Sequence, residues 1–361
     1  MNDHTPLLAA SSPCSSAAPD LHQFVPVVSV VVAVLNEEDH IDELIRSILA
    51  QDIDDCMELL LIDGMSTDKT RERIALAAKE CRLANRQIRV FDNPKRRSPY
   101  AFNIGIREAR GEYFCLFGAH ASYESNYIRE CLAVIRSSPD RVACGGLVHS
   151  LSDGSFQGNL IVDVLTNPFG SSKTSFRTQG AGTVDNIPFP VLLVSDLRDA
   201  GGYDERLHRN EDNEMNGRLI GRGVELRITD ATSASYYPVA TVKKLVAYGR
   251  RNGWWNAKMV SLRLSGLRGR HFVPSGFVVG LIGAAVLTCF GRGRLRGLGA
   301  AGLVGALGSH VALGAKATFS TTSETKGAAR LLIPPLMLAF HLSYGYGTIS
   351  YLFSKNEPGA R

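Results

Sequence analysis

The sequence predicts a doubly wound α/β domain followed by C-terminal membrane helices. Residues 25–240 alternate short apolar, β-branched runs with segments that place apolar residues at helical spacing. This alternation is typical of a largely parallel sheet with helices on both faces. Beyond residue 271, three apolar segments follow, each near the ~20 residues that a membrane-spanning helix needs.

Each element of the α/β domain is predicted by its own pattern. Residues 27–35 (VVSVVVAVL) form a continuous apolar run that suits a strand buried on both faces. Residues 40–51 carry apolar side chains at helical spacing, and Ser66, Thr67 and Asp68 offer N-cap groups for a helix that runs to about residue 81. The other expected strands are residues 57–62, 88–91, 113–117, 143–149 and 224–228, and the other expected helices are residues 100–109, 126–138 and 211–220.

Two stretches lack regular periodicity. Residues 1–24 are rich in Ser, Ala and Pro, which predicts a disordered tail. This stretch has no basic region followed by an apolar run, so we do not expect a secretory signal peptide. Residues 150–190 are rich in Gly, Ser and Asn, and we expect loops around a site there rather than a new domain.

Residues 241–271 mix basic and aromatic side chains, among them Lys243, Arg250, Trp254 and Trp255. Basic residues beside paired Trp suit an interfacial helix that lies on an anionic membrane surface. The alternative is an ordinary amphipathic helix packed on the domain. The apolar segments that follow favour the membrane interpretation.

Residues 272–361 form the predicted membrane region, with up to three apolar helices over residues 272–290, 298–315 and 331–353. Ala301, Gly305 and Ser309 have the small-xxx-small spacing that suits close helix packing in lipid. Arginines lie on both sides of the first segment, at residues 263–270 and 292–296, and the positive-inside rule would place both groups in the cytoplasm. A re-entrant or interfacial first segment would resolve this conflict.

Charge and cysteine content exclude several classes of protein. The net charge is +5, and no basic stripe dominates the first 240 residues, so we expect no nucleic-acid partner. Seven cysteines are scattered without a CxxC pair, which indicates neither a disulfide framework nor a zinc site. We expect reduced thiols, mostly in the core of a protein whose soluble part is cytosolic.

Four short motifs follow the ends of predicted strands. They are residues 34–38 (VLNEE), 63–68 (DGMSTD), 117–120 (FGAH) and 201–205 (GGYDE), the last followed by residues 209–214 (RNEDNE). Ligands of doubly wound sheets bind beyond the carboxyl ends of the strands. The motifs therefore predict one shared site at that edge.

In this order the motifs resemble the family 2 glycosyltransferases, and within them the succinoglycan-type exopolysaccharide glycosyltransferases. The resemblance covers about residues 27–255. It implies a GT-A-type doubly wound mixed sheet and an inverting hexosyltransferase that takes a sugar from a nucleotide-sugar, a UDP-sugar above all. The implied acceptor is a lipid-linked glycan or a polysaccharide at the cytoplasmic face of the cell membrane, in exopolysaccharide or cell-envelope glycan synthesis. Membrane segments also follow the transferase domain in that subgroup.

The resemblance assigns the donor nucleotide to the first two motifs. Asp63 would accept a hydrogen bond from the N–H of a pyrimidine base, with Asn36, Glu37 and Ser66 beside the nucleotide. Other interpretations of the same residues exist. Asp before Gly is a common turn pair, and acids such as Glu38 often begin helices.

The family places a metal-binding acidic motif after the fourth strand, and here this chain departs from it. The subgroup pattern Asp-Ala-His is Gly118-Ala119-His120 in this sequence. His120 is able to ligate Mn²⁺ or simply to pack at the strand end, and Gly118 puts a divalent metal (Mn or Mg) in doubt. The basic residues 95–97 are candidates for neutralising phosphate, although a solvated loop is the simpler interpretation.

The resemblance assigns the chemistry to the last motif. Asp212 would take the proton from the acceptor hydroxyl, with Glu211 beside it. Two acids at the start of a helix need no function, which is the alternative. Gly201 and Gly202 would let the backbone approach the acceptor or sugar closely.

Residues 248–255 (YGRRNGWW) loosely resemble an Arg/Trp element that lies near the donor diphosphate in the family. Arg251, or its neighbour Arg250, is therefore a candidate phosphate ligand. A membrane-surface role for both arginines is the alternative.

Three functions compete for the whole chain. The leading hypothesis is a membrane-bound inverting transferase with Asp212 as general base. The alternative is a catalytically impaired, membrane-anchored subunit for nucleotide-sugar binding or assembly, because Gly118 replaces the motif carboxylate. A nucleotidyltransferase explains the Glu211–Asp212 pair and the membrane segments less well.

Overall fold

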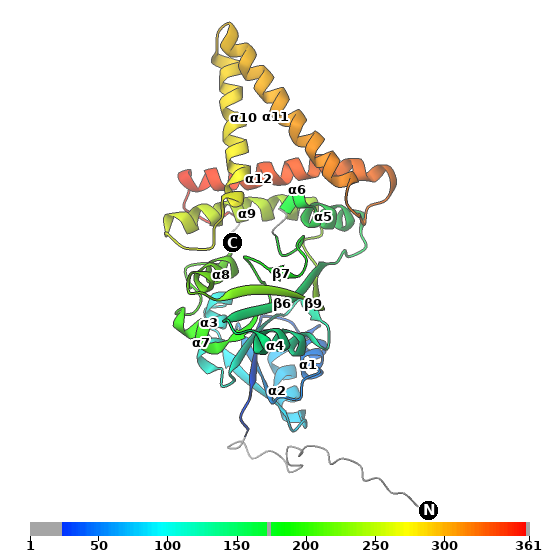
Figure 1. The fold of residues 1–361 in the computed structure, drawn as a ribbon, viewed down its shortest axis with the longest axis vertical. Coiled ribbons are helices and arrows are strands. Elements are labelled where there is room, and N and C mark those ends of the chain that lie inside the picture. Colours follow the sequence, from blue (N-terminus) through cyan, green and yellow to red (C-terminus); the bar gives the residue numbers. More distant parts are fainter. Residues whose placement is uncertain (1–23, 172–174, 359–361) are drawn as a thin grey trace, which may run out of the picture.

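The computed structural model describes residues 24–171 and 175–358. Along its long axis follow an α/β domain, a layer of helices that lie across it, and a helical hairpin that projects from this layer (Figure 1). The tail expected over residues 1–24 lies outside the described residues apart from residue 24.

Parallel strands form the half of the sheet that carries the first three motifs. Their order is β3-β2-β1-β4, and in register Val34 lies beside Asp63 while Ala33 lies beside Gly118. The motifs after β1, β2 and β4 therefore leave the sheet at the same edge. The strands are β1 (Val28–Val34), β2 (Met57–Asp63), β3 (Arg86–Asp92) and β4 (Tyr113–Gly118).

The other half of the sheet is mixed. β8 pairs antiparallel with β4 and β6, β6 pairs parallel with β9, and both β5 and β7 pair antiparallel with β9. These strands are β5 (Ala121–Tyr123), β6 (Val142–Ser150), β7 (Gly182–Thr183), β8 (Val191–Leu193) and β9 (Glu225–Tyr236). The predicted doubly wound mixed sheet is confirmed.

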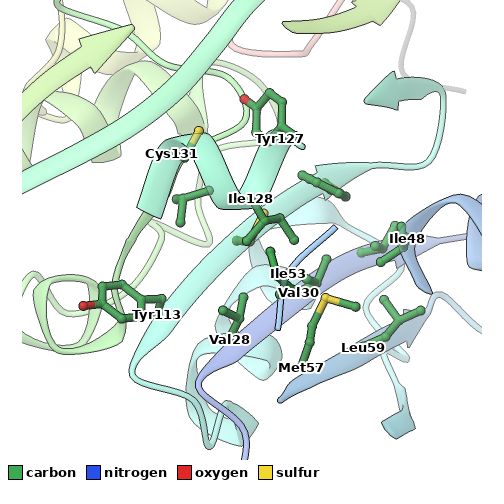
Figure 2. Packing of buried hydrophobic residues seen from close by; sticks show 14 of the residues in the cluster. Val28, Val30, Ile48, Ile53, Met57, Leu59, Tyr113, Tyr127, Ile128 and Cys131 are labelled. Atoms are coloured by element: carbon green, nitrogen blue, oxygen red, sulfur yellow. The ribbon is translucent and has the colours of Figure 1, made fainter. Parts of the chain in front are cut away.

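Helices cover both faces of the sheet, as the apolar strands require. On one face Val30 and Leu59 pack with Ile48 of α1 and Ile128 of α4 (Figure 2). The opposite face packs against α3, α7 and α8. The helices are α1 (Ile41–Leu49), α2 (Thr70–Glu80), α3 (Ser98–Glu108), α4 (Tyr127–Ser137), α7 (Val194–Asp199) and α8 (Glu211–Gly221).

Residues 150–190 are not simply loops, which corrects the expectation from the sequence. They include α5 (Phe156–Thr166) and the short α6 (Pro168–Ser171). Every residue from Leu160 to Leu165 is buried, and α5 packs against Leu245 and Phe340 of the C-terminal helices. A helix that is buried on almost all sides has no polar face, so it lacks the periodicity by which helices are recognised.

Two long helices lie side by side across the top of the α/β domain (Figure 1). They are α9 (Val242–Ser261) and α12 (Ile333–Phe353). Glycines allow their backbones to approach closely. A Cβ at Gly253 would lie 1.9 Å from the carbonyl oxygen of Tyr344, and a Cβ at Gly347 would lie 2.0 Å from that of Arg250.

The projecting hairpin consists of α10 (Val273–Phe290) and α11 (Arg294–Phe319). The 3₁₀ turns η1 (Gly269–Phe272) and η2 (Gly327–Leu332) precede α10 and α12. Among the described residues, the helices that are long and apolar enough to cross a membrane are α11 and α10 with η1. The third apolar segment forms α12, which lies against α9 instead of projecting with them.

Trp254 and Trp255 are buried in the protein. This corrects the expectation that the pair lies at a membrane surface, on which the interpretation of residues 241–271 as an interfacial helix was based. Trp254 is 2% exposed and Trp255 is 0% exposed. They pack with Leu207 and Tyr351, and the Trp255 Nε1 donates to Glu357 at 3.0 Å. The pair therefore ties α9 to the C-terminal segment, and it cannot act as an interfacial anchor.

We expect Gly253→Val to loosen the contact between α9 and α12. The new side chain would meet the backbone of Tyr344, and overpacking of this kind typically costs about 1–3 kcal/mol. Thermal unfolding of the detergent-solubilised chain should show a lower midpoint. Gly280→Val in α10, where a Cβ meets nothing within 4 Å, is the matched control. Equal midpoints for the two variants would contradict the close contact.

Candidate functional site

The first two motifs hold each other at the carboxyl edge of the sheet. The Asn36 side chain accepts from the backbone N–H of Thr67 at 2.9 Å, and the Asn36 N–H donates to the Ser66 hydroxyl at 2.8 Å. The Glu37 N–H donates to the Thr70 hydroxyl at 2.7 Å. Asn36 has a φ of 56°, a left-handed conformation that Asn tolerates better than most residues. The structure therefore brings Asn36, Glu37 and Ser66 together.

Asp63 is the buried centre of this cluster. Its side chain is 0% exposed, and it accepts from the Ser66 hydroxyl at 2.6 Å and from Arg71 at 2.8 Å. Arg71 also binds Asp92 at the end of β3, at 2.7 Å. Through Arg71, Asp63 thus connects the turn after β2 to the end of β3. It therefore has a structural role whether or not it binds a ligand.

His120 lies beside the same cluster. Its Nε2 is 3.1 Å from the Glu37 carboxylate, and its side chain is 76% exposed. A Cβ at Gly118 would lie 3.3 Å from the Phe189 ring, so a larger side chain at this position presses on that ring. Within residues 24–171 and 175–358, no three His, Cys, Asp or Glu side chains converge as a metal site would require. His120 and Glu37 offer two ligands between them.

A cavity of about 920 Å³ lies between the α/β domain and the C-terminal helices. Its walls come from β4, α3, α6, the start of α8, α9 and all three of α10, α11 and α12. At the sheet it reaches Leu116, two residues before Gly118 in β4. The carboxylates of the last motif, Glu211 and Asp212, line it.

Glu211 and Asp212 occupy the first turn of α8, where they are half-buried and line the cavity. Burial first, and the charge of Asp212 second, raise the pKa of Glu211 to about 7. Burial also raises the pKa of Asp212, although the Asn213 N–H, Arg177 and Arg209 oppose the shift. The arrangement gives a carboxylate pair that shares protons near neutral pH.

Two arginines line the cavity beside this pair. Arg177 binds the hydroxyls of Tyr236 and Tyr248, and Arg209 binds Asn252 and lies 4.5 Å from the centre of the Tyr248 ring. Burial alone would raise the pKa of Tyr248, yet the charges of Arg177 and Arg209 bring it down to about 8. The two guanidinium charges therefore favour the anionic form of a group placed beside them.

Polar contacts fix the start of α8 against α9. The Asn210 side chain donates to Asn256 at 2.7 Å, and Arg209 donates to Asn252. Tyr248, Asn252 and Asn256 follow one another at i+4 spacing and all line the cavity. One face of α9 thus supplies the polar wall opposite Glu211 and Asp212.

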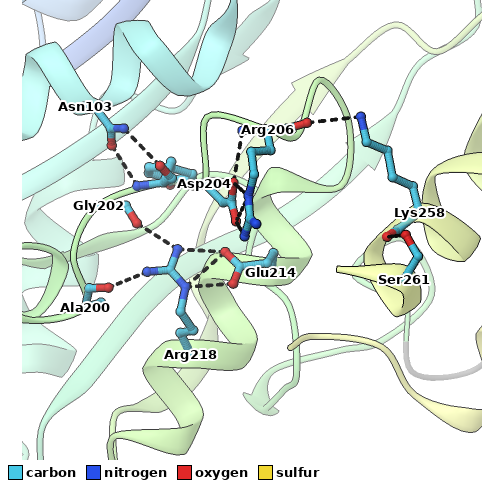
Figure 3. Close-up of polar contacts among 10 residues, drawn as sticks. Asn103, Ala200, Gly202, Asp204, Arg206, Glu214, Arg218, Lys258 and Ser261 are labelled. Atoms are coloured by element: carbon cyan, nitrogen blue, oxygen red, sulfur yellow. Dashed lines mark hydrogen bonds and ion pairs between the residues drawn. The ribbon is translucent and has the colours of Figure 1, made fainter. Parts of the chain in front are cut away.

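The loop that carries Gly201 and Gly202 lies outside the cavity wall and is hydrogen-bonded to α8. Arg218 of α8 binds Glu214 and the carbonyl oxygens of Ala200 and Gly202 (Figure 3). Both glycines have a left-handed φ, 83° and 72°, and a Cβ at Gly202 would lie 2.5 Å from the Asn103 side chain. These glycines are needed to close the loop onto α3 and α8.

Arg251 also lies away from the cavity. It pairs with Glu357 at 3.3 Å, on the face of α9 that holds the C-terminal segment. Arg250 lies 5.4 Å from the centre of the Tyr346 ring. The expected Arg/Trp element therefore acts in packing here, whereas Arg177 and Arg209 supply the cationic groups of the cavity.

The structure divides the site residues predicted from the sequence into two groups. Asn36, Glu37, Asp63, Ser66 and His120 gather at the ends of β1, β2 and β4. Glu211 and Asp212 line the cavity, whose wall includes none of that first group. Sequence reasoning missed the cavity residues Arg177, Arg209, Tyr248, Asn252 and Asn256. The i+4 spacing of the last three was a signal that was available.

Comparisons with known proteins agree with this architecture. The model of the family described as "Glycosyl transferase family 2" matches residues 29–196. A Methanococcus voltae protein, named dolichyl N-acetyl-alpha-D-glucosaminyl phosphate 3-beta-D-2,3-diacetamido-2,3-dideoxy-beta-D-glucuronosyltransferase, is 27% identical over 238 residues, which cover 63% of this chain and 73% of that protein. The succinoglycan biosynthesis protein ExoA of Rhizobium meliloti (strain 1021) is 28% identical over 229 residues, which cover 61% of this chain and 67% of that protein.

A solved structure shows the same fold. The mannosyltransferase PcManGT from Pyrobaculum calidifontis, in complex with GDP-Man and Mn²⁺, superposes with a TM-score of 0.53 at 18% identity. The match covers 92% of this chain and 89% of that one. This likeness confirms the GT-A-type sheet that the sequence predicts.

We expect Glu211 to take up a proton as the pH falls through about 7. Infrared titration of the carboxyl bands should show this step in the native chain and lose it in Glu211→Gln. Glu43→Gln, on the exposed face of α1, removes an ordinary carboxylate and serves as control. A Glu211 band that titrates near pH 4 would mean that the carboxylate pair is solvated.

Proposed function

Because residues 29–196 are a family 2 glycosyltransferase domain, we propose that the chain transfers a sugar from a nucleotide-sugar, specifically a UDP-sugar, to a lipid-linked or polysaccharide acceptor. The transfer inverts the anomeric configuration and serves exopolysaccharide or cell-envelope glycan synthesis. The observation that carries this proposal is the half-buried Glu211–Asp212 pair in a cavity whose wall at the sheet includes Leu116, close to the end of β4.

Asp212 is the general base of the proposed reaction. Its carboxylate removes the proton from an acceptor hydroxyl, and the hydroxyl oxygen attacks the anomeric carbon of the donor as the bond to the nucleoside diphosphate breaks. One displacement of this kind inverts the configuration. Burial raises the pKa of Asp212, which makes its carboxylate a stronger base than an ordinary aspartate.

The donor nucleotide binds at the cluster formed by the first two motifs. Asn36, Glu37 and Ser66 form the rim of that cluster, and Asp63 sets its shape through Ser66 and Arg71. The side chains of this cluster lie where the ligands of doubly wound sheets bind. The diphosphate then points from β1 and β2 towards the end of β4 and the cavity.

A divalent cation fits this site only with help from the donor. His120 and Glu37 are the protein ligands within reach of one another, and phosphate oxygens and water would complete the shell. The chemistry that such a cation supplies is neutralisation of the leaving diphosphate. The solved relative PcManGT contains Mn²⁺, which supports a cation in general.

The α10–α11 hairpin anchors the chain in the cell membrane, with the transferase domain in the cytoplasm. Residues 241–271, next to that domain, contain eight Lys and Arg, and the hairpin tip contains Arg292, Arg294 and Arg296. The side with more basic residues is cytoplasmic by the positive-inside rule. Because the two arginine groups lie at opposite ends of α10, a spanning α10 leaves the smaller group at the hairpin tip on the far side of the membrane.

A catalytically impaired binding subunit is the second candidate, and Gly118 favours it. The missing carboxylate removes a ligand from the place where charge develops. Gly118→Asp tests it, because turnover that is absent in the native chain and appears in this variant would support the impaired subunit. Turnover by the native chain would exclude it.

We expect Asp212→Asn to lower sugar transfer by roughly 10²–10⁴-fold, the range for loss of a general base. Membranes that contain the full chain are incubated with a panel of UDP-sugars, and transfer to the membrane fraction is measured. The affinity for UDP should not change, because Asp212 lies outside the nucleotide cluster. Asp199→Asn, at the exposed end of α7, is the control. Equal transfer by Asp212→Asn and Asp199→Asn would remove Asp212 from the role of base.

We expect EDTA to reduce transfer and added Mn²⁺ to restore it, because His120 and Glu37 alone cannot neutralise the leaving diphosphate. His120→Ala should then need a higher Mn²⁺ concentration for half-maximal activity. Full activity in EDTA would leave His120 without a metal to bind.

A further inference from the structure

The cavity beside Asp212 has a polar end and an apolar end. At the start of α8 its wall contains Arg209 and the two carboxylates, together with the half-buried Arg177. On the side of the hairpin its wall contains Phe277 of α10, Leu313 of α11 and Phe340 of α12. One continuous space thus connects the proposed base with helices that are apolar enough to lie in a membrane.

The hairpin opens towards this cavity. Near the tip, Gly299 of α11 touches α10, because a Cβ there would lie 2.6 Å from the Thr288 nitrogen. Gly305, one and a half turns further along, would meet nothing within 4 Å. The small-xxx-small face expected to pack in lipid is therefore not covered by α10 at Gly305, and the two helices diverge as Figure 1 shows.

At the base of the hairpin, α10 and α11 contact α12 at separate points, which we call the feet of the hairpin. Gly345 lies against Pro274 of α10, whereas Met337 and Pro334 lie nearest to Gly314 of α11. At 1.5 Å per residue, the two contact points are roughly 12–17 Å apart along α12. Helices in contact have axes roughly 8–10 Å apart, so an opening remains between α10 and α11. Phe340, His341 and Tyr344, between these feet, form its floor and line the cavity.

The polar end of the cavity holds two guanidinium groups that form no ion pair within the described residues, although their charges act on the neighbouring Asp212. Among the described residues, the side chains of Arg177 and Arg209 contact aromatic rings, tyrosine hydroxyls and asparagine, and neither forms an ion pair with a carboxylate. Guanidinium groups out of bulk water are stabilised by anions, and phosphate is the anion whose geometry they match best.

A histidine in the floor carries an unused polar atom. His341 Nε2 lies 3.1 Å from the Gly170 carbonyl oxygen and must donate to it, so its Nδ1 accepts from His310 Nε2 at 2.9 Å. His310 is 7% exposed, and its Nδ1 has no hydrogen-bond partner within the described residues. A neutral His310 therefore retains a lone pair that a polar group in the cavity can satisfy.

We infer that the acceptor is a glycan joined through phosphate to a long-chain lipid, with its phosphate between Arg177 and Arg209 and its hydrocarbon chain leaving between α10 and α11. This inference rests on the proposed function and chooses the lipid-linked acceptor over a free polysaccharide. The acceptor sugar then lies beside Asp212, and the lipid never has to leave the bilayer. The alternative is that these two arginines bind the diphosphate of the donor instead.

Binding measurements on the full chain in nanodiscs test the ligand class. The probes are farnesyl phosphate, farnesol and inorganic phosphate, and UDP is titrated in parallel. We expect farnesyl phosphate to bind at least tenfold more tightly than either of the other two, without competition from UDP. Equal affinity for farnesol and farnesyl phosphate, or displacement of farnesyl phosphate by UDP, would overturn the inference.

Two variants test the placement. Ala306→Trp fills the opening from α11 and should weaken farnesyl phosphate binding at least tenfold, whereas Val304→Trp, at a position 74% exposed and outside the cavity wall, should not. Arg177→Gln should lower the affinity for farnesyl phosphate to the level of the affinity for farnesol. Unchanged UDP affinity shows that each variant is folded. Unchanged farnesyl phosphate binding in both Ala306→Trp and Arg177→Gln would refute the site. A native chain that binds farnesyl phosphate but binds no nucleotide would instead refute the proposed function.

Discussion

The site depends on the polar contact between the start of α8 and one face of α9. Asn210 binds Asn256 and Arg209 binds Asn252, so the first turn of α8, with Asp212, is fixed relative to the helices that cross the top of the domain. The contact continues from Asn256 to Tyr344 of α12. A chain of amide groups thus connects the carboxylates to both helices under the hairpin. Without it, the cavity would have no defined width.

The same contact explains why the glycine loop matters although it does not line the cavity. Arg218 binds Glu214 and the loop carbonyls, which joins the loop to α8. α8 is therefore held both by this loop and by α9. Because its two acids are kept out of bulk water, their pKa values rise, and the helix N-terminus partly offsets that cost.

Local patterns in the sequence were enough for the sheet but not for the cavity. The apolar runs at β1 and β2 predict buried parallel strands, and the motifs at their ends predict which edge carries the site. Arg177 could not be found in this way, because its partners Tyr236 and Tyr248 are about 60 and 70 residues away in sequence. The helix α5 was missed because it is buried all round, and the Trp pair was misplaced because its contacts with Leu207 and Tyr351 are long-range.

The unequal lengths of α10 and α11 have a mechanical meaning. α10 has 18 residues and rises about 27 Å, close to the hydrocarbon thickness of about 30 Å, whereas α11 has 26 residues and rises about 39 Å. The longer arm has to lean to end at the same depth, and tilt is how a helix adapts to a bilayer of different thickness. If the hairpin anchors the chain as proposed, the spacing of the two arms at their base would vary with lipid composition, and the surrounding bilayer would help to set the size of the cavity mouth.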